Sequence, residues 1–199
     1  MSPVVPRMRA ALSGLERPLY QTHTWAGEVV EVGLRGVERR ALIDAAHVLD
    51  QHVVDFGCAS GAETTWAAEL GAASVVGIEH NEKYVPVVAA LRDVLRAEEP
   101  LAGARVLSPI AWDLRHGVPT EAKHATVAFC FAITHHLGYR PLWKELPLVR
   151  YVYLEGGVDA GYTERSLSDA EFQATLIGTT PGRSATPNPR RNVFLLQRR

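Results

Sequence analysis

The sequence contains few cysteines and no excess of charge of either sign. Its two cysteines, Cys58 and Cys130, lie in apolar runs, too far apart for a CxxC metal site and too few for a disulfide framework. With 21 basic and 22 acidic residues, the formal net charge is -1, which excludes the strong positive field of a protein that packages nucleic acid. These absences favour a reducing, intracellular setting.

Long hydrophobic runs are absent as well. No apolar stretch approaches the roughly 18 to 20 residues of a membrane span, and the first residues lack the charged and apolar regions of a signal peptide. We therefore expect a cytoplasmic protein without a membrane partner. The histidines form neither an H-x-x-H nor an H-E-x-x-H group, so the sequence predicts no zinc site.

The residues that are present suffice for one domain with a core of its own. The chain has 199 residues, of which 47% are hydrophobic, and this length fits one full-sized domain and falls short of two. We expect residues 1–49 to form an N-terminal arm and a helix over 37–49, and residues 50–199 to form the core. The arm carries a polar and aromatic cluster that either closes over a bound ligand or packs on the sheet: Tyr20, Gln21, His23 and Trp25.

Strand and helix patterns alternate through the middle of the chain. Apolar runs predict five strands, over 52–56, 74–78, 105–110, 125–132 and 150–154. Helical periodicity predicts three helices, over 63–70, 82–97 and 142–146. Such alternation predicts an α/β fold, a Rossmann-like three-layer sandwich with a mostly parallel sheet. Two final strands over 172–179 and 192–197 have no helix between them, so we expect an antiparallel hairpin.

The sharp turn after the strand over 52–56 is the strongest candidate for a binding site. Asp55 lies near the end of this strand, and Gly57 and Gly61 follow it. Glycines let the chain leave a buried strand sharply and let a ligand lie against the backbone, while the start of the next helix offers free N–H groups. Turns of this kind lie at the carboxyl edge of the sheet, where open α/β folds bind ligands.

Two further acidic residues follow neighbouring strands of the predicted sheet. Glu79 ends the strand that comes after the turn, and a carboxylate there can accept hydrogen bonds from both hydroxyls of a ribose. Asp113 follows the next strand, where it either accepts a hydrogen bond from an adenine amino group or belongs to an ordinary turn. Both carboxylates are therefore candidate binding residues.

Together these segments resemble those of class I S-adenosylmethionine-dependent methyltransferases. In that family the pattern acid-x-Gly-x-x-x-Gly forms the cofactor loop, and Asp55, Gly57 and Gly61 occupy its places, with Ala59 where a central glycine is common. The resemblance covers residues 50–157, and the predicted hairpin is similar to the family's reversed final strand. It implies that S-adenosylmethionine is the cofactor and that it is held by Asp55, Gly57, Ala59, Gly61, Glu79 and Asp113.

His135 and His136 are the candidate catalytic residues, because they follow the fourth strand at the cofactor edge. Methyl transfer is a displacement at a sulfonium carbon, so the protein aligns the nucleophile and removes its proton, a step that an imidazole with a pKa near ~6.5 suits. Alternatively, one histidine packs under a loop and the other is exposed. Glu155 either orients one of them or caps a turn. Residues 125–134 lack the carboxylates of the family's magnesium-dependent members, so no metal is implied.

Several acceptors and functions fit the sequence. A small molecule with an oxygen or nitrogen nucleophile is favoured, because only short segments are left to build a lid over the site. An RNA nucleoside is the alternative, although we explain the basic residues near the C-terminus more readily as a solvated tail: Arg183, Arg190, Arg191, Arg198 and Arg199.

Two other classes of protein share the same turn. A non-catalytic scaffold or sensor that kept the cofactor fold is one of them, and the central alanine of the loop permits it. A nicotinamide-dependent enzyme is the other, but its G-x-G-x-x-G pattern would require glycines where this chain has Ala59 and Ala62. The spacing therefore favours the methyltransferase interpretation over the nicotinamide one.

Overall fold

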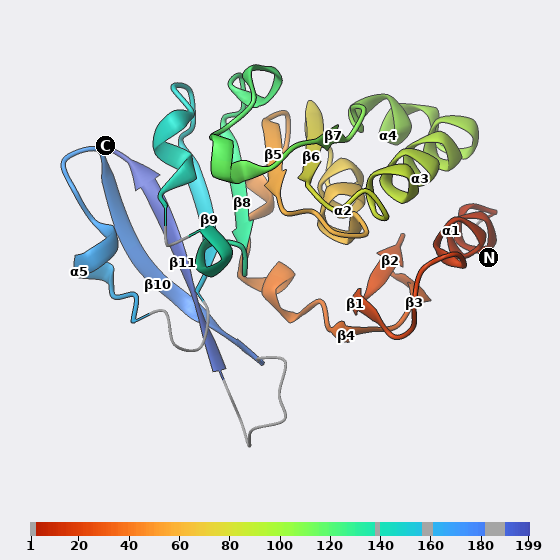
Figure 1. Ribbon diagram of the computed structural model, residues 1–199, viewed down its shortest axis with the longest axis horizontal. Coiled ribbons are helices and arrows are strands. Elements are labelled where there is room, and N and C mark those ends of the chain that lie inside the picture. Colours follow the sequence, from red (N-terminus) through yellow and green to blue (C-terminus); the bar gives the residue numbers. More distant parts are fainter. Residues whose placement is uncertain (1–2, 138–139, 157–160, 182–189) are drawn as a thin grey trace.

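The computed structural model describes residues 3–137, 140–156, 161–181 and 190–199, and within them seven strands form the central sheet (Figure 1). In spatial order these strands are β10 (Phe172–Pro181), β11 (Arg190–Arg198), β9 (Tyr151–Glu155), β8 (Val127–Phe131), β5 (His52–Phe56), β6 (Ser74–Glu79) and β7 (Ile110–Ala111). Neighbouring strands are parallel except at β11, which is antiparallel to both β9 and β10. The predicted α/β fold with an antiparallel terminal hairpin is confirmed.

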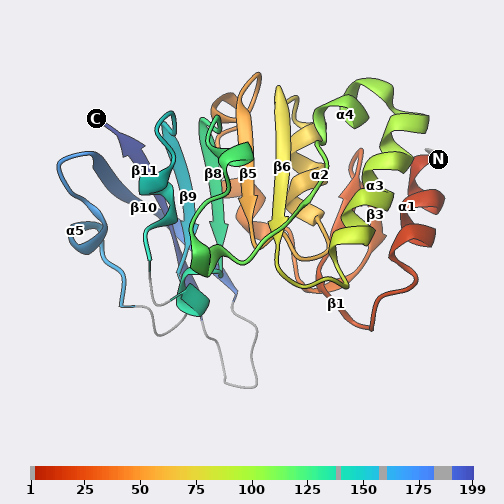
Figure 2. The ribbon, with the colours of Figure 1, turned by 45° about the horizontal axis from the view of Figure 1, so that its top comes forward.

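Successive side chains of each strand point to opposite faces of the sheet, so the core has two halves. In β8, Phe129 and Phe131 pack into one half, and Ala128 and Cys130 pack into the other. The first half lies against three helices, and we call this side the helical face: α1 (Val4–Leu12), α2 (Ala62–Glu69) and α3 (Val85–Glu98). Figures 1 and 2 both place α1 beside α3 at the β6 end of the sheet.

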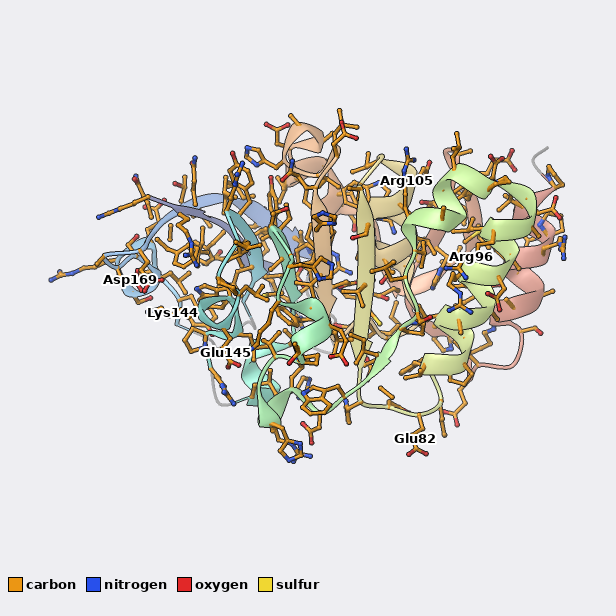
Figure 3. All side chains as sticks on the ribbon, turned by 90° about the horizontal axis from the view of Figure 1, so that it is seen from above. Glu82, Arg96, Arg105, Lys144, Glu145 and Asp169 are labelled. Atoms are coloured by element: carbon orange, nitrogen blue, oxygen red, sulfur yellow. The ribbon has the colours of Figure 1, made fainter. Side chains whose placement is uncertain are left out.

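The opposite face is covered mainly by short turns. Its core residues come from η3 (Leu114–His116), η4 (Thr120–Ala122), η6 (Leu142–Glu145) and the short helix α5 (Glu164–Leu167). Lys144 on η6 forms an ion pair with Asp169 at 2.5 Å, just before β10, and this contact ties the turn layer to the terminal hairpin (Figure 3). Within the described parts of the chain, no helix is both long enough and apolar enough to cross a bilayer.

The N-terminal segment has more regular structure than the sequence predicts. Residues 1–19 lack sustained periodicity, yet α1 forms within them and buries Val4, Val5 and Met8. Pro6 lies in the first turn of this helix, where the N–H that proline lacks would have no helical partner. The helix packs against α3, and such tertiary burial is what stabilises a short helix in a protein.

Residues 19–35 add two small sheets beside α1. The strand β1 (Leu19–Gln21) is parallel to β4 (Gly33–Arg35), and β2 (His23–Trp25) is antiparallel to β3 (Glu28–Glu31). Glycine is required at the start of β4, because a Cβ there would lie 2.2 Å from the carbonyl carbon of Gln21. The two sheets place the polar and aromatic cluster of the arm against the main domain, with the side chains of Gln21, His23 and Trp25 buried.

The predicted helix over 37–49 is wrong. The segment forms two short 3-10 turns, η1 (Glu38–Leu42) and η2 (Ala45–His47), joined by extended backbone at Ile43 and Asp44. The Asp44 carboxylate accepts a hydrogen bond from the backbone N–H of Ala46, with 2.9 Å between the heavy atoms. This local competition for backbone N–H groups interrupts a helix that the apolar spacing alone favours.

The third strand is much shorter than the predicted 105–110. The helix α4 (Pro100–Arg105) occupies the start of that range, Val106 makes an isolated bridge with Val75, and β7 follows only at Ile110–Ala111. Pro109 immediately precedes β7 and has no N–H to donate to a strand ladder. This explains why regular pairing with β6 begins so late.

Candidate functional site

The loop after β5 runs through left-handed backbone at three positions. The φ angles are 65° at Gly57, 46° at Ala59 and 83° at Gly61. Gly57 N donates a hydrogen bond to the carbonyl of Ile78 at 2.8 Å, so the loop lies against the end of β6. A Cβ at Gly57 would lie 2.7 Å from Ile133 Cδ1, so glycine meets both a conformational and a steric requirement there.

Glu79 joins this loop to the end of β6. Its side chain is only 6% exposed, and Oε2 accepts a hydrogen bond from Ala59 N at 2.9 Å while Oε1 accepts one from Asn81 N at 2.8 Å. The Nδ1 atom of His80 lies 3.1 Å from Oε1. The carboxylate therefore stands at the carboxyl edge of the sheet, as the sequence predicts for it.

Asp55 faces α2 under the same loop. Thr64 donates a hydrogen bond from Oγ1 to Asp55 Oδ2 at 2.8 Å, and the carboxyl is almost completely buried. Burial raises the pKa of Asp55 to about 7, and the neighbouring carboxylates of Glu63 and Glu79 act in the same direction. Asp55 thus supports the loop from below, and its predicted contact with a cofactor stays a prediction.

A pocket of about 410 Å³ opens where the carboxyl ends of β5, β6 and β8 meet. Its lining includes Gly57 of the loop, the apolar side chains of Ile78 and Leu114, and Ile133 after β8. The chain reverses direction across the sheet between β5 and β8, and such a switch point is where open α/β sheets bind ligands. The volume lies within the ~300–1,000 Å³ of small-molecule sites.

Asp113 and Trp112 form one wall of this pocket. The carboxylate of Asp113 accepts hydrogen bonds from Arg115 Nε at 2.8 Å and Nη2 at 2.6 Å. These bonds hold the pKa of Asp113 well below its usual range, so its oxygens are charged acceptors at neutral pH. Trp112 donates from Nε1 to the carbonyl of Gly117 at 2.8 Å, which fixes its ring in the wall.

The two candidate catalytic histidines lie on η5 (Thr134–Leu137), directly after β8. His136 is exposed and lines the pocket, whereas the side chain of His135 lies outside the described part of the structure. The same described residues contain no group of three or more His, Cys, Asp or Glu side chains placed to hold a metal ion. Of the two candidate histidines, His136 is therefore the one that the structure describes as lining the pocket.

Glu155 ends β9 and binds arginines of the N-terminal segment. It is completely buried, and it accepts hydrogen bonds from Arg35, from Thr180 and, at 3.3 Å, from Arg39 Nη1. The sequence alone points to no role for these arginines. They stand out there only as three arginines within 35–40, two of them in the segment expected to be a helix.

The N-terminal segment also contacts the start of α2. His23 Nε2 lies 2.8 Å from the hydroxyl of Ser60 in the loop. Arg40 donates from Nε to Glu63 at 2.7 Å and from Nη2 to the carbonyl of Ala62 at 3.0 Å. The arm is therefore part of the wall behind the loop and packs against the start of α2. The sequence leaves open closure over a ligand or packing on the sheet, and this contact with a helix is a third arrangement.

No protein-family model and no curated protein matches the sequence. Solved structures do match. WbdD in complex with a kinase inhibitor has a TM-score of 0.65 and 20% identity over 96% of this chain, which spans 47% of that protein. Magnesium protoporphyrin IX methyltransferase from Synechocystis PCC 6803 with bound SAM has a TM-score of 0.56 and 18% identity, over 80% of this chain and 76% of its own.

An RNA-modifying protein has the same architecture. The 23S rRNA methyltransferase ErmE has a TM-score of 0.53 and 16% identity, over 81% of this chain and 68% of its own. The chain has the class I methyltransferase fold. At these identities the similarity concerns the fold, and the predicted resemblance is confirmed at that level.

The pocket and the buried arginines lie on opposite faces of the sheet, near the carboxyl ends of its parallel strands. The pocket lies over the loop after β5, beside side chains of the turn-covered face such as Ile78. The buried arginines and Glu155 lie on the helical face, where Arg39 stacks 4.7 Å from the centre of the Phe131 ring.

Two of the basic residues near the C-terminus, Arg191 and Arg198, also pack within the protein. Arg198 lies 5.0 Å from the centre of the Phe172 ring, and Arg191 lies near Glu155. The interpretation of these two arginines as a solvated tail is therefore wrong.

Proposed function

We propose that this protein transfers the methyl group of S-adenosylmethionine to an oxygen or nitrogen nucleophile of a small molecule. The observation that carries the proposal is the pocket at the switch point, which is bounded by the glycine loop at Gly57 and by the charged acceptor Asp113. Glu79 lies between two lining residues, Ile78 and His80. An adenosine would find an apolar slot for its ring and carboxylates for its polar groups here.

The donor and acceptor groups around the pocket fit such a cofactor. Each oxygen of Glu79 already accepts one backbone hydrogen bond, and a carboxylate oxygen has a second lone pair with which to accept a ribose hydroxyl. Asp113 is held in place by Arg115 and can accept a hydrogen bond from the adenine amino group. Leu114 and Ile133 supply the apolar contacts on either side of the ring.

The reaction needs little from the protein beyond alignment and one proton acceptor. The cofactor supplies a methyl group on a positively charged sulfur; the S–CH₃ bond breaks as the bond to the acceptor oxygen or nitrogen forms, and the acceptor releases its proton. His136 lines the pocket and takes that proton in the proposed reaction.

Calorimetric titration tests the cofactor half of the proposal. The wild-type protein, Glu79→Gln and the control Glu82→Gln are titrated with S-adenosylhomocysteine and with NAD. Glu82 is exposed three positions away and points outward (Figure 3). We expect saturable S-adenosylhomocysteine binding that is about tenfold weaker in Glu79→Gln, because a charge-assisted bond to a hydroxyl is lost, and unchanged in Glu82→Gln. Lack of adenosyl binding by the folded wild type contradicts the proposal.

Turnover tests the catalytic half. The protein is incubated with S-adenosylmethionine and a panel of hydroxyl and amine acceptors, and the release of S-adenosylhomocysteine is measured. We expect release that depends on an acceptor and falls in His136→Ala. Saturable binding without release by any acceptor supports the scaffold or sensor instead, and NAD binding without adenosyl binding supports the nicotinamide-dependent enzyme.

A further inference from the structure

Four arginines gather on the helical face near the carboxyl end of β9. Arg35 ends β4, Arg39 and Arg40 lie on η1, and Arg191 lies on β11. Their hydrogen-bonded or ion-paired carboxylates in the described parts of the chain are Glu63 and Glu155. We call these four arginines and two glutamates the arginine cluster. Four guanidinium groups face two carboxylates, so the cluster carries an excess of buried positive charge.

The pairing within the arginine cluster is uneven. Arg40 is fully engaged, since Nε donates to Glu63, Nη1 to Thr24 Oγ1 at 2.6 Å and Nη2 to the carbonyl of Ala62. By contrast, Arg35 Nη1 and Arg39 Nη2 are buried and have no hydrogen-bond partner among the residues that the structure describes. These two side chains are only 4% and 2% exposed. The unpaired nitrogens therefore belong to Arg35 and Arg39, the two arginines that also donate to Glu155.

Arg191 has the same shortage of partners. Within the described parts of the chain, its buried Nε and Nη1 atoms have no hydrogen-bond partner, and Nη1 lies 3.9 Å from Glu155 Oε2, beyond hydrogen-bonding distance. Its side chain is 12% exposed, more than those of Arg35 and Arg39. Arg191 is therefore the least buried of the three arginines that face Glu155.

Unpaired buried charges are costly, so this arrangement calls for a partner. A buried donor without an acceptor loses its hydration and gains nothing in return, and the penalty is larger for charged groups. Burial lowers the pKa of Arg35. The carboxylate of Glu155 acts in the opposite direction and raises it, whereas the like charges of Arg39 and Arg191 lower it further. Asp55 adds little compensation at neutral pH, because burial raises its pKa to about 7. Burial opposes the charge of Arg39, but Glu63 and Glu155 outweigh this effect and raise its pKa. An additional negative charge would therefore mainly offset the cost at Arg35 and Arg191.

We propose that the N–H groups of Arg35, Arg39 and Arg191 bind an anionic group of the methyl acceptor, a carboxylate or a phosphate. This inference rests on the proposed function. Guanidinium groups present planar pairs of N–H donors that match the two oxygens of such an anion. The acceptor, not the cofactor, is the source of the anion, because Glu155, Thr180 and Arg191 belong to β9, β10 and β11 and not to the strands around the cofactor loop.

The first experiment measures anion binding directly, with inorganic phosphate and acetate as probes. The melting temperature is followed against probe concentration at constant ionic strength, with and without S-adenosylhomocysteine. Arg191→Gln is compared with Arg190→Gln, which removes the same charge one residue away; Arg190 is exposed and donates only to Thr179 in the described structure. Arg191→Gln is chosen because Nε and Nη1 of Arg191 have no hydrogen-bond partner among the described residues, whereas the loss of Arg35 would remove one of the hydrogen bonds to the buried Glu155.

We expect saturable stabilisation of the wild type by at least one probe. Its midpoint should rise about tenfold or more in Arg191→Gln, as expected when a charge-assisted hydrogen bond is removed, and stay within about twofold in Arg190→Gln. Stabilisation that does not saturate, or that is equal in the two variants, overturns the proposal. Saturable phosphate or acetate binding without any adenosyl binding overturns the proposed function while leaving the anion site in place, so the two failures are distinguishable.

The second experiment identifies the source of the anion. Titrations of the wild type and of Arg191→Gln compare S-adenosylhomocysteine, which carries a carboxylate, with 5′-methylthioadenosine, which lacks the amino acid portion. We expect the substitution to change neither affinity by more than about twofold. A loss of affinity of tenfold or more for S-adenosylhomocysteine alone assigns the arginines to the cofactor carboxylate and overturns the proposal.

Discussion

His23 and Ser60 join the N-terminal segment to the cofactor loop. The imidazole Nε2 lies 2.8 Å from the serine hydroxyl, and both side chains are buried. His23 belongs to β2, and Ser60 lies between two left-handed positions of the loop, Ala59 and Gly61. Because a buried hydrogen bond restricts both partners, the loop conformation depends on a segment that precedes the main sheet.

The protonation of His23 should make the wild type less stable in acid. Burial lowers its pKa to about 3, and the charge of Arg40 acts in the same direction. Between about pH 6.5 and pH 3 the unfolded chain binds the proton and the native state does not, so this residue removes up to about 1.4 kcal/mol of stability per pH unit as the pH falls. Urea unfolding at pH 7, 6 and 5 should show this loss in the wild type relative to His23→Gln. Equal pH dependence in the two proteins would contradict it.

Asp55 should have the opposite effect. Its pKa is raised to about 7, mainly by burial, so the native state binds the proton more tightly than the unfolded chain between about pH 4 and pH 7. The stability that this adds is present at low pH and is lost as the pH rises through 7. We expect the free energy of unfolding of the wild type, relative to Asp55→Asn, to increase as the pH falls from about 7.5 to about 5, a range that includes the raised pKa of Asp55. The exposed Asp93→Asn should show no such trend.

Gly57→Ala should weaken both the fold and cofactor binding. The substitution places a side chain at φ 65° and brings its Cβ to 2.7 Å from Ile133 Cδ1, an atom of the pocket wall. Gly27→Ala is the matched control, since Gly27 has φ 76° and no atom within 4 Å of the added Cβ. Chemical unfolding should show a loss of about 1–2 kcal/mol in both variants. Affinity for S-adenosylhomocysteine should fall in Gly57→Ala only, and an equal fall in Gly27→Ala would refute the role of Ile133.

Glu63→Ala should be among the most destabilising single changes on the helical face. The carboxylate is 1% exposed and accepts hydrogen bonds from Arg39 at 2.9 Å and from Arg40 at 2.7 Å. Its removal deprives two buried guanidinium groups of the carboxylate that accepts from their Nε atoms, at a cost of about 3–5 kcal/mol. Glu69→Ala, on the same helix, removes one hydrogen bond from Ala26 N and should cost about 1 kcal/mol. Guanidinium chloride unfolding compares them, and a similar cost for both variants would argue against a tight ion pair at Glu63.

Local patterns were sufficient for the loop and for the strands of the central sheet other than β7. The strand over 52–56 and the helix over 63–70 match β5 and α2 because their apolar spacing and the intervening glycines act over a few residues. Local patterns were insufficient where a distant partner decides the structure, as in α1, which forms against α3. They also failed at 37–49, where the side chain of Asp44 and packing around the arginines favour 3-10 turns over a helix.

The sequence by itself determined the alternation of β5, α2, β6 and α3, the glycine loop after β5 and the acidic residue that ends β6. These features depend on neighbours along the chain, where periodicity and backbone freedom act directly. Only the tertiary structure decided that Arg35 and Glu155, 120 residues apart, form a buried pair, and that Arg191 lies beside them. Such contacts arise because folding brings distant segments to one edge of the sheet, where desolvation makes the balance of charge matter.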